Sequence, residues 1–454
     1  MANITVKNAA DLATKLAAAK GGETFLLAPG NYGLVAIKRR NFATPITIQS
    51  ASGTDPAKIV NLAITESSGI RVRGLDLGAP LADGEAQKGA RNCAQVTNSN
   101  RISFDRVHVY GSLDGDPTND RDGIGVRGSH HVTVSNSTFE QLGRGMGFGS
   151  SQDITVSNNV FRNMSTDGID FAQVQRVKVD GNSFTNFKPK DGDHPDAIQF
   201  WTAGTPAAST DISITNNQIM MGGPIGTQGI FMRDEVGTLP YERVKIDNNL
   251  IYINNGYNGI GVLGGKNVTV TGNSVLSQTS DTLKLRINLT NVAGAQVSGN
   301  VTDQLLATGS TNVTYGTNYI LCSDPSKTAL IPNLLNGIGT TATDLVIEGM
   351  GYQLPQVTAP TSLRAGAVAA PAPKKSPVAP VLAAAAGGRG ARKAMPAFTA
   401  PTLGERLDTP TRHPAAATVT PFFGGDAGAM LTLRNSLALH EFGLAVSPML
   451  GDRR

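Results

Sequence analysis

Two short stretches of the chain place acidic side chains close together. STDGID, at residues 165–170, contains two aspartates, and DGDHPDAIQFW, at residues 191–201, contains three more and a histidine. A carboxylic acid can protonate a leaving oxygen while a second carboxylate activates water or attacks carbon, and a histidine can move protons near neutral pH. This composition predicts an acid–base site. The candidate catalytic residues are Asp167, Asp170, Asp196 and His194.

The elements that must position these residues are internal repeats. A first phrase recurs every 22 to 32 residues, and a second phrase follows each copy after roughly ten to twenty residues. The first phrase reads DGIGV, RGMGF, DGIDF, DAIQF, QGIFM, NGIGV and DTLKL, starting at Asp122, Arg144, Asp167, Asp196, Gln228, Asn258 and Asp281. The second reads VTVSNSTF, ITVSNNVF, VKVDGNSF, ISITNNQI, VKIDNNLI, VTVTGNSV and AQVSGNV. Apolar and polar residues alternate in both phrases, which predicts short strands separated by turns.

Repeats of this kind must stack, because a few short strands without a helix cannot bury their apolar face alone. Stacking brings asparagines of the second phrase into one column, where amides can hydrogen-bond from rung to rung. This column contains Asn159, Asn182, Asn217, Asn249, Asn273 and Asn300. The residues before them tolerate the left-handed backbone of a tight turn. They are Asn158, Gly181, Asn216, Asn248, Gly272 and Gly299.

The repeat pattern resembles the right-handed parallel β-helix of pectate lyases, polygalacturonases and phage tailspikes, the pectin lyase fold, over about residues 25–320. The resemblance implies an all-β, single-stranded parallel solenoid. Residues 9–20 have helical periodicity and predict a short helix that caps the open end of the stack. We predict an N-terminal cap over residues 1–24, the β-helix over 25–355 and an extended tail over 356–454.

Strand alternation predicts which residues of the first phrase face the interior and which face outward. The interior column is expected to contain Ile124, Met146, Ile169, Ile198, Ile230, Ile260 and Leu283. The first outward column contains Gly125, Gly147, Asp170, Gln199, Phe231, Gly261 and Lys284. The second outward column contains Arg127, Gly149, Ala172, Trp201, Arg233, Leu263 and Arg286. Rungs lie about 4.8 Å apart, so the small residues predict an exposed trough that leads to the aspartates and fits an extended polymer.

STDGID is similar to the NTDG-x-D signature of polygalacturonase-type hydrolases, in which Asp167 and Asp170 match, and aspartates three apart also resemble endorhamnosidase tailspikes. The paired Asp-Asp and the Gly-His-Gly of the hydrolases are missing. LKLR, at residues 283–286, is only loosely similar to their Arg-x-Lys motif. Aromatic and basic side chains beside the carboxylates would hold the sugar chain. The predicted substrate-binding residues are Gln199, Trp201, Arg233, Lys284, Arg286 and Arg144.

Other interpretations of these residues stay open. A lyase or C5-epimerase would neutralise a uronate carboxylate with arginine or Ca²⁺ and remove a proton with a base such as His194. Aspartates at strand starts also cap turns, and Asp122 and Asp281 are assigned that role. No cofactor is required by the predicted chemistry; calcium is the alternative for residues 114–123, DGDPTNDRDG, although a solvated turn is favoured. Cys93 and Cys322 are interpreted as small buried residues.

Composition bears on where the protein works. Only 16% of residues are charged, and the tail holds 11 Lys and Arg against 5 Asp and Glu, so the basic character belongs to the tail. No export signal and no stretch of 18 apolar residues is recognisable, which predicts neither standard export nor membrane insertion.

We therefore hypothesise a virion-associated, tailspike-like homotrimer that binds and depolymerises a host surface polysaccharide as a glycosidase or lyase. Its tail would attach it to other virion structural proteins, and no nucleic acid partner is expected. One alternative is a bacterial polysaccharide lyase, hydrolase or epimerase that is secreted or periplasmic by an unrecognised route. Another is a non-catalytic protein that binds glycans or builds a particle.

Overall fold

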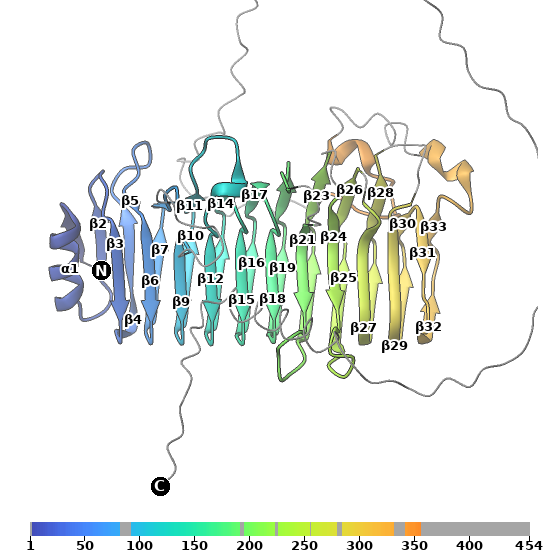
Figure 1. Ribbon diagram of the computed structural model, residues 1–454, viewed down its shortest axis with the longest axis horizontal. Helices are drawn as coiled ribbons and strands as arrows, with labels where there is room; N and C mark the ends of the chain where they lie inside the picture. The colour runs from blue at the N-terminus through green and yellow to red at the C-terminus, as the bar shows by residue number, and fades with distance from the viewer. Residues whose placement is uncertain are drawn as a thin grey trace, which may run out of the picture. The chain divides into compact units, whose positions relative to one another are not determined.

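The computed structural model describes residues 2–81, 92–190, 195–222, 226–254, 256–278, 284–330 and 341–355. Their strands pair in parallel and wind into coils that stack along one axis (Figure 1). One sheet holds 22 strands, which form two ladders, and the other holds 11 strands, which form a third. The predicted all-β parallel solenoid is confirmed. His194, Asp281, Leu283 and the tail lie outside the described residues.

The first ladder carries the first phrase of each repeat. Its strands are β3 (Leu34–Lys38), β6 (Asn61–Thr65), β9 (Ala94–Thr97), β12 (Ile124–Arg127), β15 (Met146–Gly149), β18 (Ile169–Ala172), β21 (Asp196–Trp201), β24 (Gln228–Arg233), the first halves of β27 (Asn258–Thr271) and β29 (Arg286–Ser298), and β31 (Gln304–Leu306). Their apolar residues point inward and are buried, as in the stacked rings of Phe148, Phe171 and Phe200, whose centroids lie 5.2 and 4.5 Å apart. Stacked aromatic pairs stabilise the coil beyond the area they bury.

The second ladder carries the second phrase. Its strands are β1 (Asn3–Val6), β2 (Thr24–Leu27), β4 (Asn41–Ser50), β7 (Ser68–Arg73), β10 (Asn100–Asp105), β13 (His130–Ser135), β16 (Gln152–Ser157), β19 (Gln175–Asp180), β22 (Thr210–Thr215), β25 (Tyr241–Asp247), the second halves of β27 and β29, and β32 (Thr311–Tyr315). Because β1 pairs with β2, the predicted cap also contains a strand that the sequence analysis missed.

The third ladder follows the turn after each second phrase. Its strands are β5 (Lys58–Ile59), β8 (Asp76–Leu77), β11 (His108–Tyr110), β14 (Thr138–Leu142), β17 (Val160–Met164), β20 (Ser183–Thr185), β23 (Gln218–Met221), β26 (Leu250–Ile253), β28 (Ser274–Ser277), β30 (Val301–Thr302) and β33 (Tyr319–Ile320). A 3-10 turn, η1 (Pro117–Asn119), lies between β11 and β12.

The predicted asparagine column forms a buried ladder at the corner between the second and third ladders of strands. Asn182 donates from Nδ2 to Oδ1 of Asn217 at 3.0 Å, and Asn217 donates in the same way to Asn249 at 2.9 Å. The backbone N–H of each also donates to the side-chain oxygen one rung further on. The preceding column has positive φ, from 54° at Asn248 to 70° at Gly299, so both predicted roles are confirmed.

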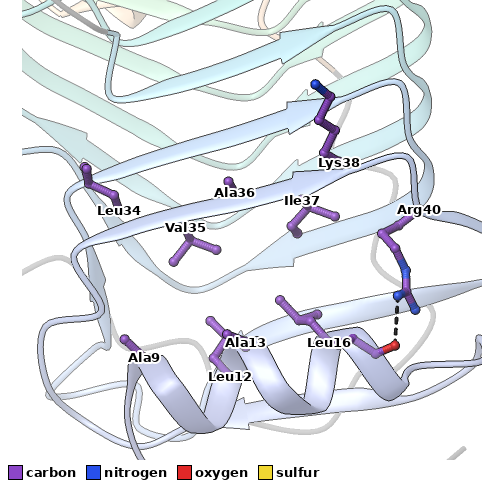
Figure 2. A pocket seen from close by; sticks show the side chains of 11 residues that line it. Ala9, Leu12, Ala13, Leu16, Leu34, Val35, Ala36, Ile37, Lys38 and Arg40 are labelled. Atoms are coloured by element: carbon purple, nitrogen blue, oxygen red, sulfur yellow. Dashed lines mark hydrogen bonds between the residues drawn. The ribbon is translucent and has the colours of Figure 1, made fainter.

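Helix α1 (Ala9–Ala18) covers the first coils, close to the predicted range. Asn8 caps it by accepting a hydrogen bond from the backbone of Asp11, and Leu12 and Leu16 are buried. An apolar pocket of about 260 Å³ lies between α1 and β3, the first strand of its ladder. Figure 2 shows the side chains that line it. Arg40 donates to the carbonyl oxygen of Ala17 near the C-terminal end of the helix. The helix therefore closes this end of the stack.

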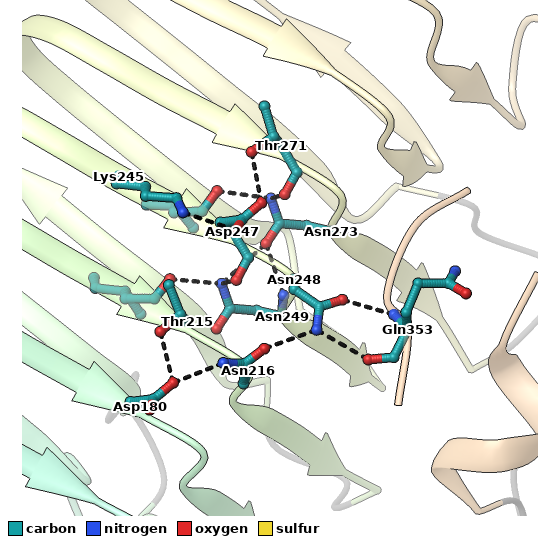
Figure 3. A network of polar contacts seen from close by, with 12 residues as sticks. Asp180, Thr215, Asn216, Lys245, Asp247, Asn248, Asn249, Thr271, Asn273 and Gln353 are labelled. Atoms are coloured by element: carbon teal, nitrogen blue, oxygen red, sulfur yellow. Dashed lines mark hydrogen bonds and ion pairs between the residues drawn. The ribbon is translucent and has the colours of Figure 1, made fainter. Parts of the chain in front are cut away.

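At the other end, two 3-10 helices, η3 (Pro325–Leu330) and η4 (Ala342–Leu345), precede a strap over residues 347–353. Tyr352 is fully buried in a second apolar cluster with residues of β26, β28 and β30. Figure 3 shows Asn248 paired with the strap: its Oδ1 accepts from Gln353 N at 2.6 Å, and its Nδ2 donates to Gln353 O at 2.9 Å. The strap thus fastens the chain after the last coil. Cys93 is buried, but Cys322 is exposed, so the prediction that both are buried is wrong for Cys322.

Candidate functional site

The outward face of the first ladder brings the predicted aspartates onto neighbouring rungs. Asp170 lies opposite Gln199, and Ala172 lies opposite Trp201, because β18 and β21 pair in the predicted register. On the next rung Phe231 follows Gln199, and Arg233 follows Trp201. The columns predicted from alternation are confirmed from β12 to β27.

The pairing of β27 with β29 departs from the predicted register, and it is irregular between Asn258 and Ile260 at the start of β27. Ile287, Asn288 and Thr290 of β29 occupy the positions predicted for Leu283, Lys284 and Arg286. Arg286 instead pairs with Asn258 in the strand-start column, which contains the first residue of each first phrase. Lys284 is an exposed residue before β29. The predicted positions of Lys284 and Arg286 are therefore wrong, since DTLKL is not the strand that continues the ladder.

The exposed trough is also wrong as a description of this face. Asp170 and Asp196 point away from the coil interior but are only 1% and 0% exposed, and Trp201 is only 9% exposed. Next to Gly125 the space is filled, because a Cβ there would meet the side chains of Asn92 and Gln95. Asp167 and Gln199 retain partial exposure, whereas Arg233 is exposed. A ligand on this face would thus meet Asp167, Gln199 and Arg233 first.

Arg144 binds two of the aspartates. Its Nη1 lies 2.6 Å from Oδ2 of Asp170, and its Nη2 lies 3.0 Å from Oδ2 of Asp122. Asp122 also accepts from the backbone N of Arg144, so it fixes the arginine rather than only capping a turn. A carboxylate held by a guanidinium is a poor proton donor. Asp170 therefore fits an electrostatic role better than that of a general acid.

Asp167 and Asp196 are joined by a hydrogen bond between neighbouring rungs. Oδ1 of Asp167 accepts from the backbone N of Asp196 at 2.7 Å. Burial, and then the charge of Asp167, raise the pKa of the Asp196 carboxyl well above its usual range, although hydrogen bonds from Gln199 and Gln228 act against this shift. Oδ1 of Asp196 is buried and has no hydrogen-bond partner among the described residues. The site thus places a buried carboxyl with a raised pKa next to the partly exposed side chain of Asp167.

The sequence analysis named Gln228 and Asn258 in the strand-start column but assigned them no role. The structure shows that they continue the polar contacts from Asp196: Asn258 donates to Oε1 of Gln228 at 2.7 Å and accepts from Nε of Arg286 at 3.0 Å. Arg286 also lies over the ring of Tyr257, 5.4 Å from its centroid. The sequence feature that could have indicated these contacts is the presence of polar residues at the same position of successive repeats. These contacts hold Gln228, which hydrogen-bonds to Asp196 from the rung opposite to that of Asp167.

Calcium was the cofactor alternative at residues 114–123. In the structure Asp120 is buried and accepts from Ser112 and Gln141, while Asp114 accepts from Asp116 N and from Gln141. Asp116 caps η1. Across the described ranges, no group of three or more His, Cys, Asp or Glu residues is arranged to hold a metal ion. The loop is therefore organised by its own hydrogen bonds.

Comparisons with known proteins agree with this architecture. A family model described as a right handed beta helix region matches residues 92–275. The fold is a right-handed parallel β-helix. No protein of curated function matches the sequence. In the described part of the chain, no helix has the length and apolar character needed to span a membrane.

Several solved structures align with this chain at low identity and with TM-scores below 0.5. The Dettilon tailspike protein (gp208) aligns with a TM-score of 0.45 and 16% identity, covering 68% of this chain and 64% of the tailspike chain. PfbA, a surface adhesin of Streptococcus pneumoniae, aligns with a TM-score of 0.45 and 12% identity, covering 67% of this chain and 88% of the adhesin chain. A PL6 family polysaccharide lyase from Pseudopedobacter saltans aligns with a TM-score of 0.44 and 13% identity, covering 77% of this chain and 98% of the lyase chain.

Proposed function

We propose that the protein binds a polysaccharide across the first ladder and cleaves it by acid–base chemistry. The observation that carries the proposal is the Asp167–Asp196 pair, in which burial raises the pKa of the Asp196 carboxyl while the neighbouring Asp167 is partly exposed. Pairs of carboxyl groups with different pKa values are the means by which glycosidic bonds are cleaved near neutral pH. In this proposal Asp167 contacts the sugar. Asp196 is the acid, and its proton is transferred to the leaving oxygen of the glycosidic bond.

Gln199, Phe231 and Arg233 would bind the sugar chain beside this pair. Gln199 donates to Oδ2 of Asp196 at 2.8 Å, so its amide is already oriented toward the reacting groups. Phe231 lies against Gly261. A Cβ at residue 261 would lie 2.8 Å from the Phe231 ring, so the glycine leaves room for the ring. Aromatic and guanidinium groups next to a carboxyl pair suit a ring-shaped, hydroxylated ligand.

The test is depolymerisation of a panel of bacterial surface polysaccharides by the full chain and by Asp167→Asn and Asp196→Asn variants. Both substitutions keep the side-chain shape, and we expect cleavage to fall by about 10² or more while binding and the melting temperature change little. Asp55→Asn is the matched control, because Asp55 is an exposed aspartate far from the face in sequence. Reducing ends would indicate hydrolysis, and unsaturated products would indicate elimination. Full activity of both site variants would contradict the proposal.

A second candidate is glycan binding without cleavage. It is favoured by the near-complete burial of Asp170 and Asp196, which a sugar can reach only if side chains around them rearrange. The same panel distinguishes the two candidates. A non-catalytic protein would bind one polysaccharide and release no fragments, and Arg233→Ala would weaken that binding while Asp196→Asn would not.

We also propose that the protein works as a homotrimer on a virion and that residues 356–454 attach it to other structural proteins. The basic, Ala- and Pro-rich composition of this segment supports a linking rather than a catalytic role. Light scattering of the full chain and of a chain ending at Pro355 tests the assembly. We expect a trimer and a monomer respectively, and a monomeric full chain would refute trimer formation.

A further inference from the structure

The two ends of the coil stack differ. At the C-terminal end, β31 and β32 pair with β29, and β33 pairs with β30, and within the described ranges none of the three has a strand on its other side. Leu305 and Val313 continue interior columns but remain partly exposed, whereas their neighbours Ile287 and Ala295 are 0% and 4% exposed. Tyr315 is 52% exposed. This end therefore presents apolar surface and unpaired strand edges, which proteins ordinarily cover.

The asparagine ladder is also incomplete at this end. In every rung the backbone N–H donates to the side-chain oxygen of the following rung, as Asn273 does to Asn300 and Asn300 does to Asn318. Asn318 is the last described member, and its own backbone N–H has no acceptor among the described residues. One more side-chain oxygen, placed one rung further on, would complete the ladder.

Residues 431–436, LTLRNS, repeat the residue pattern of the second phrase. They match VTVSNS at residues 132–137, where Val132 and Val134 are buried and Asn136 adopts a left-handed φ of 54°. Ser137 occupies the ladder column, and its Oγ accepts from the backbone N of Val107. The tail segment thus offers two apolar residues, a turn residue and a ladder residue at the same spacing.

We propose that residues 431–436 of the same chain dock on the C-terminal end of the stack as one more strand of the second ladder. Leu431 would lie opposite Val313, Thr432 opposite Thr314 and Leu433 opposite Tyr315. Ser436 would then accept from the backbone N–H of Asn318. This inference is independent of the proposed function, since it rests on the strand edge and on the sequence of the tail.

The connecting chain is long enough. Gln353 lies beside Asn248, and the proposed strand is four rungs further on, about 20 Å at the usual spacing of about 4.8 Å. A flexible linker over residues 356–430 has a root-mean-square span of about 45 Å, so it covers this distance without being extended. A flexible tether whose span exceeds the distance to be bridged by about twofold gives an effective concentration on the order of millimolar, which favours docking within one chain.

Disulfide trapping tests the register. In a Cys322→Ser background, Thr314→Cys paired with Thr432→Cys would place two cysteines on adjacent rungs, within the Cα separation that a disulfide spans. Thr314→Cys paired with Arg434→Cys is the matched control, two residues out of register on the same strand face. We expect the first pair to oxidise on the order of tenfold faster. Equal rates would overturn the proposal, and so would a disulfide between mixed singly substituted proteins that forms as fast as the disulfide in the doubly substituted chain.

Hydrogen exchange at the Asn318 amide provides an independent measurement. We expect this amide to exchange on the order of tenfold more slowly in the full chain than in a chain ending at Pro355. Ser436→Ala should remove the protection, and Ser436→Asn should keep it, because asparagine serves in the same column from Asn159 onward. The same exchange rate in the full and truncated chains would show that the ladder ends at Asn318.

Discussion

Replacing Asp303 by asparagine should change how the stability of the coil depends on pH. Asp303 is 0% exposed, and its Oδ2 accepts from Ser277 Oγ at 2.5 Å, from Ser277 N at 3.1 Å and from Leu285 N at 3.1 Å. Burial raises the pKa of this carboxyl to about 6 despite these three hydrogen bonds. The folded state therefore binds a proton here more tightly than the unfolded chain does.

The size of the effect follows from the shift. The pKa rises from its ordinary 3.8 to about 6, and each pH unit corresponds to about 1.4 kcal/mol, so the free energy involved is about 3 kcal/mol. Its sign is that of a raised pKa. The contribution of the protonated carboxyl is complete below about pH 4, declines as the pH rises and is lost above the folded pKa of about 6.

Asp303→Asn cannot ionise, so the free energy of unfolding of the variant relative to the natural chain should rise by about 2.4 kcal/mol, most of the full effect, between pH 4 and pH 7. The buried amide nitrogen adds a constant cost of about 1–3 kcal/mol, which changes the offset and not the slope. Urea unfolding followed by the fluorescence of Trp201, the only tryptophan, measures both. Asp55→Asn, at an exposed position, is the control. A difference that is independent of pH would refute the reasoning.

Three further substitutions probe the stack. Asn217→Ala leaves two buried donors of the neighbouring rung without an acceptor and should lower the free energy of unfolding by about 3 kcal/mol by chemical denaturation, with Asn217→Ser costing less. Tyr352→Ala empties the cluster under the strap and should cost about 3–5 kcal/mol, detected as faster limited proteolysis of residues 341–355. Gly168→Ala would place a Cβ 2.5 Å from the carbonyl oxygen of Ala197 and should lower the free energy of unfolding, measured by calorimetry, by at least about 2 kcal/mol. Gly74→Ala is the control: a Cβ there would meet nothing within 4 Å, and the expected loss is about 1 kcal/mol.

The fold was predictable because alternation and turn chemistry agree in every coil. Ile169 and Ile198 face inward, and Asp170 and Gln199 face outward, as period two requires, and a one-residue slip would have exposed the whole apolar column. Asn182 fell in the correct column because it follows a residue with left-handed backbone. Local sequence was sufficient wherever the repeat was regular.

The same reasoning failed where the repeat is irregular. The prediction took DTLKL as the strand that continues the ladder, whereas Ile287 lies opposite Ile260 and Arg286 lies opposite Asn258. The burial of Asp170 could not be predicted either, because Arg144 covers it from a neighbouring rung and alternation gives only the direction of a side chain. Direction is a property of one strand, whereas exposure depends on everything that packs around it.

The buried aspartates of the described residues lie on one side of the coil. Among the described residues, the buried aspartates are Asp120, Asp170, Asp196 and Asp303, and each lies in a first-ladder strand or in the segment that enters one. The opposite corner meets the same need for side-chain acceptors with neutral amides such as Asn217. A buried carboxylate costs more stability than an amide that makes the same hydrogen bonds. The coil can thus supply buried acceptors without charge, and Asp196 and its partly exposed neighbour Asp167 are the carboxyl groups to which the proposed function assigns proton transfer.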